Sequence, residues 1–156
     1  GEQIGWKNGR SIWITKTPLH YQSPLLDYGV VVPAEFITDL ASVPRLPLAY
    51  LVAGGRGIRS AVIHDFAYQF GSWIRTRDAK PVEVQRDLVD RVFHESLLLD
   101  PISGAGTTVA WQMWAAVRLG GRGVWKGQDA RVAELNPIWS DTHTERAAMS
   151  RGEETP

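Results

Sequence analysis

The apolar and polar positions of the first forty residues alternate or form short runs, which is typical of β-strands. Residues 11–17 are rich in β-branched and aromatic side chains, and residues 6–10 contain the Asn-Gly pair of a hairpin turn. A short extended piece is expected around residues 20–21, between two prolines. Residues 30–32 predict a further strand, stopped by a proline, and residues 35–38 predict another.

Apolar residues of the second half recur at the three-to-four spacing of helices. Residues 58–70 predict a first helix, ended by Gly71. Pro81 is well placed in the first turn of a second helix that runs to about residue 99. A third helix is expected over residues 107–119, before a Gly-Gly pair.

These elements predict an α+β fold in which a small N-terminal β-rich portion packs on three helices. The length of 156 residues suits a single globular domain, which we place at residues 1–125. Residues 126–156 are mostly polar and predict a C-terminal extension that would be disordered alone. We expect such an extension to bind a partner, either another protein or a second copy of the chain.

The composition excludes several classes of function. Seventeen basic residues balance seventeen acidic ones, so no strong field favours nucleic acid. The absence of cysteine excludes disulfides, thiolate nucleophiles and cysteine-ligated zinc. No apolar run is long enough to span a bilayer, and the first residues do not have the pattern of a signal peptide.

The first predicted helix carries three polar side chains in an apolar segment. His64 and Tyr68 are four residues apart and share one helix face, with Asp65 at its flank. All three groups are costly to bury unpaired, so they either form a polar network in the core or perform chemistry. Asp90 on the next helix can reach His64 or Tyr68 if the two helices are antiparallel, or it forms an ordinary surface pair with Arg86.

Other polar positions give weaker signals. Asp39 and Ser42 lie in a Thr-Asp-Leu-Ala-Ser-Val-Pro segment, where an aspartate often caps a turn; the functional interpretation makes Asp39 a metal ligand or a partner of His64. Ser42 lacks a nucleophile-elbow pattern. Residues 54–57 are rich in glycine but do not match a phosphate-binding loop, and His94 ranks below Asp90 as a site residue.

Four motifs occur in an order that resembles a known family. They are Thr-Asp-x-Ala-Ser-Val-Pro at residues 38–44, His-Asp-x-x-Tyr at 64–68, Arg-x-x-x-Asp-x-x-Phe at 86–93 and Ala-Val-Arg at 116–118. Over residues 10–121 the chain looks like uncharacterised proteins of tailed phages, prophages and their bacterial hosts, known only as a domain of unknown function. The resemblance implies a location in the virion or the host cytoplasm.

The His-Asp-x-x-Tyr helix followed by an aspartate on the next helix is also similar to the active-site helices of phospholipases A(2). This second resemblance implies a phospholipase A(2)-like helical core in which His64 activates a water to attack an ester. It further implies that Asp65 holds calcium, that Asp90 and Tyr68 orient His64, and that the substrate is a lipid. Those enzymes have disulfides and a glycine-rich calcium loop, for which this chain has no clear counterpart.

Two functions follow from the sequence. The first is a phage-associated, metal-assisted ester hydrolase, which predicts an open cleft above His64 and a metal near Asp65. The second is a non-enzymatic virion, tail or assembly component, which predicts that His64 is sealed in the core. A role in cutting peptidoglycan has only the phage resemblance in its favour.

Overall fold

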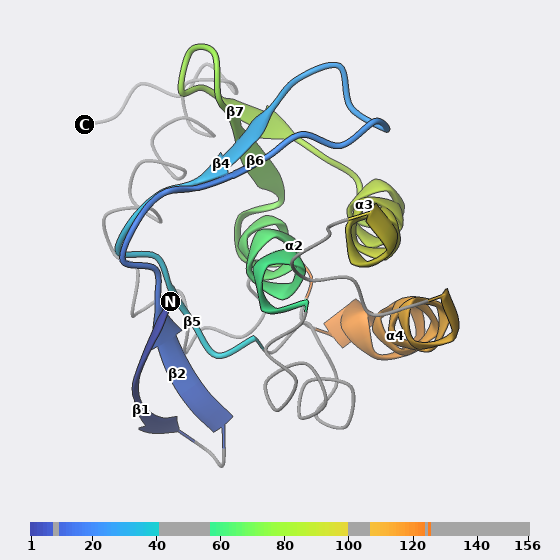
Figure 1. Ribbon diagram of the computed structural model, residues 1–156, viewed down its shortest axis with the longest axis horizontal. Coiled ribbons are helices and arrows are strands. Elements are labelled where there is room, and N and C mark those ends of the chain that lie inside the picture. Colours follow the sequence, from blue (N-terminus) through green and yellow to red (C-terminus); the bar gives the residue numbers. More distant parts are fainter. Residues whose placement is uncertain (8–9, 41–56, 100–106, 124, 126–156) are drawn as a thin grey trace, which may run out of the picture.

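The computed structural model describes residues 1–7, 10–40, 57–99, 107–123 and 125, which form two antiparallel sheets and three helices (Figure 1). The α+β class predicted from the sequence is confirmed. The predicted C-terminal extension, Ser42 and most of the glycine cluster at residues 54–57 lie outside the described residues.

The first sheet has the strand order β1-β2-β5. Its strands are β1 (Glu2–Lys7), β2 (Arg10–Ile14) and β5 (Ile37–Thr38). Lys7 pairs with Arg10 across β1 and β2, which confirms the hairpin that the Asn-Gly pair predicted. Trp13 of β2 pairs with Thr38 of β5, so the end of β5 is held beside the hairpin.

The second sheet has the order β3-β4-β6-β7 and corrects one prediction. Its strands are β3 (Leu19–Tyr21), β4 (Val30–Val32), β6 (Ser72–Arg75) and β7 (Pro81–Glu83). The prediction that Pro81 opens a helix is wrong, because Pro81 begins β7 and pairs with Ile74. Proline lacks an N–H donor but fits an edge strand, and β7 is the edge of this sheet.

The three helices are α2 (Ile58–Phe70), α3 (Arg86–Leu99) and α4 (Thr107–Gly120). A short 3₁₀ helix, η1 (Gly121–Gly123), follows α4. Helix α2 is central: strands lie on one side of it, and α3 and α4 lie on the other (Figure 1). Because both sides are covered, residues 60–68 are all buried, and the polar residues of α2 lie in the core.

Helix α2 ends as the sequence predicted. Gly71 has a φ of 66° and donates its N–H to the carbonyl of Ala67 at 2.7 Å, a left-handed cap that glycine adopts without strain. The chain then turns directly into β6, where the indole of Trp73 donates a hydrogen bond of 2.9 Å to the carbonyl of Ile63. This bond fixes the helix against the second sheet.

No helix in the described part of the chain is long and apolar enough to cross a membrane.

Candidate functional site

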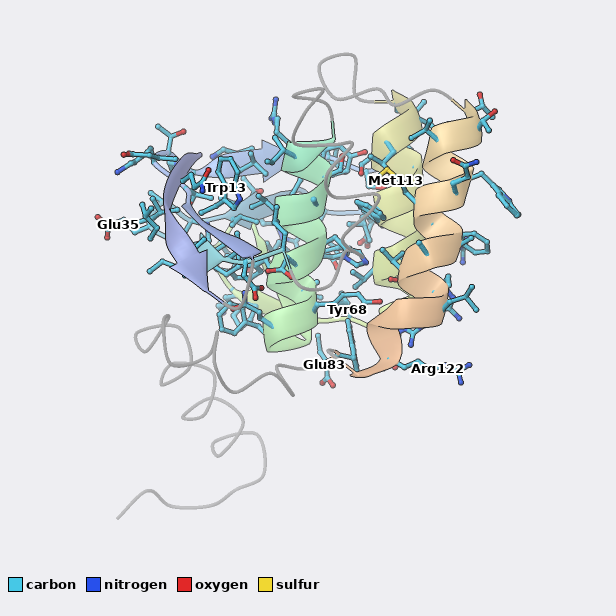
Figure 2. All side chains as sticks on the ribbon, turned by 90° about the horizontal axis from the view of Figure 1, so that it is seen from below. Trp13, Glu35, Tyr68, Glu83, Met113 and Arg122 are labelled. Carbon is cyan, nitrogen blue, oxygen red and sulfur yellow. The ribbon has the colours of Figure 1, made fainter. Side chains whose placement is uncertain are left out.

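The polar residues of α2 meet one carboxylate of α3. His64 Nε2 lies 2.8 Å from Asp90 Oδ1, and Tyr68 Oη donates a hydrogen bond of 2.6 Å to the same oxygen. Tyr68 projects from α2 towards the side of α3 and α4 (Figure 2). Residues 64 and 68 share a face because they are one turn apart, so a single aspartate on the facing helix can reach both.

Two arginines bind the other oxygen of this carboxylate. Arg118 Nη1 of α4 lies 3.0 Å from Asp90 Oδ2, and Arg86 Nε of α3 lies 3.5 Å from it. Arg86 also donates a hydrogen bond of 2.7 Å to the carbonyl of Arg118, which ties the start of α3 to the end of α4. We call His64, Tyr68, Asp90, Arg86 and Arg118 the Asp90 network.

Aromatic rings enclose the network. The His64 ring lies 4.2 Å from the Tyr68 ring and 4.6 Å from the Phe93 ring, measured between centroids. Trp125 meets Tyr68 edge to face at 5.0 Å. A Cβ atom on Gly121 would lie 2.5 Å from Tyr68 Oη, so only glycine fits beside the phenol. These contacts hold each ring in one orientation.

The network is buried, and burial governs its ionisation. His64 and Tyr68 are each 1 % exposed and Asp90 is 0 % exposed. Burial raises the pKa of the Tyr68 phenol, and its hydrogen bond to Asp90 raises that pKa further. Burial alone would also raise the pKa of Asp90, but hydrogen bonds from His64, Tyr68 and Arg118 outweigh it and the pKa lies below its ordinary value.

The ionised state of Asp90 decides the tautomer of His64. A carboxylate can only accept hydrogen bonds, so His64 Nε2 carries a proton and donates a hydrogen bond to Asp90. In the neutral ring the acceptor lone pair is then on Nδ1. The arrangement can therefore orient an imidazole as a proton acceptor and stabilise the cation that it would become.

Asp65 lies on the other flank of α2. Its Oδ2 accepts hydrogen bonds from Thr38 Oγ1 of β5 and from Gln69 Nε2, the latter at 3.1 Å. Thr38 also accepts the N–H of Leu40 at 2.9 Å, so the chain turns after β5 around this hydroxyl. Asp65 is 2 % exposed, and Asp39 is half-buried in the same turn. Among the described residues, no group of three or more acidic or histidine side chains could hold a metal ion.

The comparisons with known proteins identify the family. A family model described as "Protein of unknown function (DUF1353)" matches residues 13–117. The chain belongs to this DUF1353 family. The matched region runs from β2 to the last turn of α4 and contains four members of the Asp90 network, all but Arg118. Comparison with curated proteins gave no match. Comparison with solved structures gave none either.

The structure of this DUF1353 chain brings together most residues that the sequence singled out. Asp90 reaches both His64 and Tyr68, the outcome expected for antiparallel helices, and it also pairs with Arg86. His94 lies apart from the network, with its ring 5.9 Å from that of Trp114.

Sequence reasoning missed two contributors to the site. Arg118 belongs to the Ala-Val-Arg motif but was given no role, because its contact with Asp90 joins residues 28 apart in the chain. Thr38, the partner of Asp65, opens the Thr-Asp-x-Ala-Ser-Val-Pro motif but was given no role, because its contact joins residues 27 apart in the chain.

Proposed function

We propose that this chain is an ester hydrolase in which His64 is the general base. The observation that supports it is the pair of contacts on Asp90 Oδ1, from His64 Nε2 at 2.8 Å and Tyr68 Oη at 2.6 Å. A base of this kind needs a second group that fixes its tautomer and orientation. Asp90 has that role in the proposal, and Tyr68 holds Asp90 in place.

The charges of the network also support a chemical role. One buried carboxylate is shared by two guanidiniums, a phenol and an imidazole. Apolar residues of similar volume would stabilise a helix interface at least as well as such a buried ionic group. In the proposal, water gives a proton to His64 Nδ1 as its oxygen attacks the ester carbonyl, and Asp90 stabilises the imidazolium formed. The imidazolium then returns that proton to the alcohol oxygen as the ester C–O bond of the tetrahedral intermediate breaks, which releases the acid and the alcohol.

The resemblance to phospholipase A(2) helices gives the proposal its substrate class and its metal. We propose a lipid ester as substrate and Asp65 as a ligand of calcium, with Asp39 as a second ligand from the adjoining turn. Carboxylate and hydroxyl oxygens suit calcium, and the Asp65 carboxylate lies beside the Thr38 hydroxyl. A bound calcium would supply positive charge for the oxyanion that develops on the ester.

The first experiment measures hydrolysis of a fluorogenic phospholipid and a fluorogenic short-chain ester, with calcium and with a chelator. The wild type should release product in calcium and lose most of its rate in the chelator. Asp65→Asn should lose calcium binding in calorimetry together with activity, whereas Asp27→Asn, an exposed aspartate away from the site, should keep both. Calcium binding that survives in Asp65→Asn would contradict the role given to Asp65.

A second function is supported by a separate observation, the burial of the site. His64 is 1 % exposed and Asp90 0 %, as expected of a non-enzymatic component whose polar network only fixes the packing of three helices. In this alternative the chain is a virion, tail or assembly protein of a phage, bound to a neighbour or to itself through its C-terminal residues. Absence of turnover on every ester, with Asp65→Asn and His64→Gln changing only stability, would favour it.

A further inference from the structure

A pocket lies on the side of α2 opposite the Asp90 network. Its volume is about 140 Å³, and it opens between β2, β3 and the first turns of α2. Trp13, Leu19, Ile58 and Val62 form its apolar walls. Trp13 lies on the side of α2 that faces the strands, away from α3 and α4 (Figure 2). Most of the lining surface is therefore apolar and favours a hydrocarbon group over water.

The pocket adjoins the proposed metal end of the site. Thr38 lines the pocket, and its hydroxyl hydrogen-bonds to Asp65 Oδ2. Val62 lines the pocket from the same helix that carries His64 and Asp65. A molecule in the pocket would thus be separated from the Asp65 carboxylate by a single side chain.

Two cationic side chains line this pocket. Lys16 and Arg59 are among its lining residues, and none of the described lining residues is acidic. Lys16 already pairs with Glu2 at 2.7 Å, with both side chains exposed. No ion pair of Arg59 occurs within the described residues, so its guanidinium is the stronger candidate to bind an anion.

We infer that this pocket binds a small anionic amphiphile, with its hydrocarbon chain against Trp13 and Ile58 and its anionic group on Arg59. The inference goes beyond the proposed function and does not depend on it, because the pocket and the Asp90 network lie on opposite sides of α2. Because an apolar cavity of about 150 Å³ holds a benzene molecule, we expect room for roughly six carbon atoms. The ligand class would be a short hydrocarbon chain that carries a phosphate or carboxylate.

Binding is tested on the full chain by calorimetry with hexyl phosphate, hexanol and inorganic phosphate. Hexyl phosphate should bind, and the two half-molecules should bind at least about tenfold more weakly, because each lacks either the apolar or the charge-assisted contact. Equal binding of inorganic phosphate would overturn the inference in favour of a bare phosphate site. Equal binding of hexanol would overturn the role of Arg59.

Substitutions in the pocket test where hexyl phosphate binds. Arg59→Gln should weaken hexyl phosphate about tenfold and leave hexanol unchanged, while Arg59→Lys should retain most of the affinity. Ile58→Trp should abolish binding by filling the pocket, and Leu19→Trp does so from the opposite wall should the first variant fail to fold. Arg77→Gln, an exposed arginine that does not line the pocket, is the matched control. Full affinity in both tryptophan variants would overturn the inference.

The outcomes separate this inference from the proposed function. Hexyl phosphate lacks a carboxylic ester, so its binding does not depend on turnover. Tight binding without hydrolysis of any ester would sustain the pocket and contradict the hydrolase. If the chain does not bind hexyl phosphate but hydrolyses an ester at a rate that Ile58→Trp leaves unchanged, the pocket would be contradicted and the hydrolase would be sustained.

Discussion

At the scale of single residues, Asp90 organises the site because every other member of the network binds one of its two oxygens. Asp90→Asn keeps the shape of the side chain but leaves two guanidiniums without their buried counter-charge. Removing one partner of a buried ion pair costs about 3 kcal/mol or more of unfolding free energy. Urea unfolding at neutral pH should show this loss, and the exposed Asp27→Asn should unfold like the wild type.

The stability difference between wild type and Asp90→Asn should depend on pH, because the pKa of Asp90 is lower in the folded chain than its ordinary value. A carboxyl of this kind stabilises the fold fully above its unfolded pKa of about 3.9, and the contribution is lost as the pH falls towards the folded pKa. The gap in stability between wild type and Asp90→Asn should therefore narrow below about pH 4. A gap that stays constant down to acid unfolding would contradict the ionised Asp90.

Tyr68 gives the complementary test at alkaline pH. Tyr68→Phe removes the hydrogen bond to Asp90 and should cost about 2 kcal/mol of unfolding free energy at neutral pH. Because burial raises the pKa of the Tyr68 phenol, folding keeps it protonated, and its contribution is lost as the pH rises above the unfolded value of about 10. As the pH rises from neutral to above about 10, the free energy of unfolding should fall more for the wild type than for Tyr68→Phe.

The matched control for Tyr68 is Tyr28→Phe. Tyr28 is half-buried, and its pKa is also raised by burial, but it does not contact the Asp90 network. Tyr28→Phe should lose stability at alkaline pH as the wild type does, because its Tyr68 is intact. If Tyr68→Phe and the wild type lost stability in parallel, the buried hydrogen bond would not contribute as described.

At the scale of elements, η1 packs its first residue on the phenol of α2. A Cβ on Gly121 would lie 2.5 Å from Tyr68 Oη and 2.9 Å from its Cε1. Gly121→Ala should therefore destabilise the chain by about 1–3 kcal/mol, the usual cost of an overpacked site, measured by thermal or urea unfolding. Gly5→Ala, where a Cβ meets no atom within 4 Å, should be close to neutral. Equal stabilities of the two variants would contradict this packing.

The elements also show how far the sequence could predict the fold. Local signals sufficed for α2, whose apolar spacing and terminal Gly71 mark its end, and for the β1–β2 hairpin with its Asn-Gly turn. They failed at β6 and β7, because Pro81 suits both a first helical turn and an edge strand. The strand conformation depends on pairing of β7 with β6 and of β6 with the distant β4, and the second pairing leaves no local pattern.

Some contacts of the candidate site could be predicted from the sequence, and others could not. His64, Tyr68 and Asp90 could be predicted to meet because helix geometry alone places the first two on one face. The contacts of Thr38 with Asp65 and of Arg118 with Asp90 join separate elements, and they depend on how those elements pack. The sequence contains no periodic signal for contacts of this kind.

At the scale of the whole molecule, α2 separates the Asp90 network from the pocket lined by Trp13, Ile58 and Arg59. His64 and Tyr68 on one face contact Asp90 of α3, and the other face lines the pocket together with β2 and β3. The strands and the two other helices lie on opposite sides of α2 (Figure 1). Asp65 connects the two faces, since it follows His64 in the chain and bonds to Thr38 of the pocket wall. The proposed base, the proposed metal ligand and the proposed ligand pocket are therefore arranged around one buried helix.

The most direct test of the central claim is kcat/KM for a fluorogenic hexanoyl ester, in calcium, for wild type, His64→Gln and His94→Gln. His64→Gln should lower kcat/KM by about 100-fold or more, the usual contribution of a general base. His94→Gln, which changes a histidine outside the Asp90 network, should retain the wild-type rate. Equal rates for all three proteins, or no hydrolysis by the folded wild type, would contradict the claim that His64 is a catalytic base.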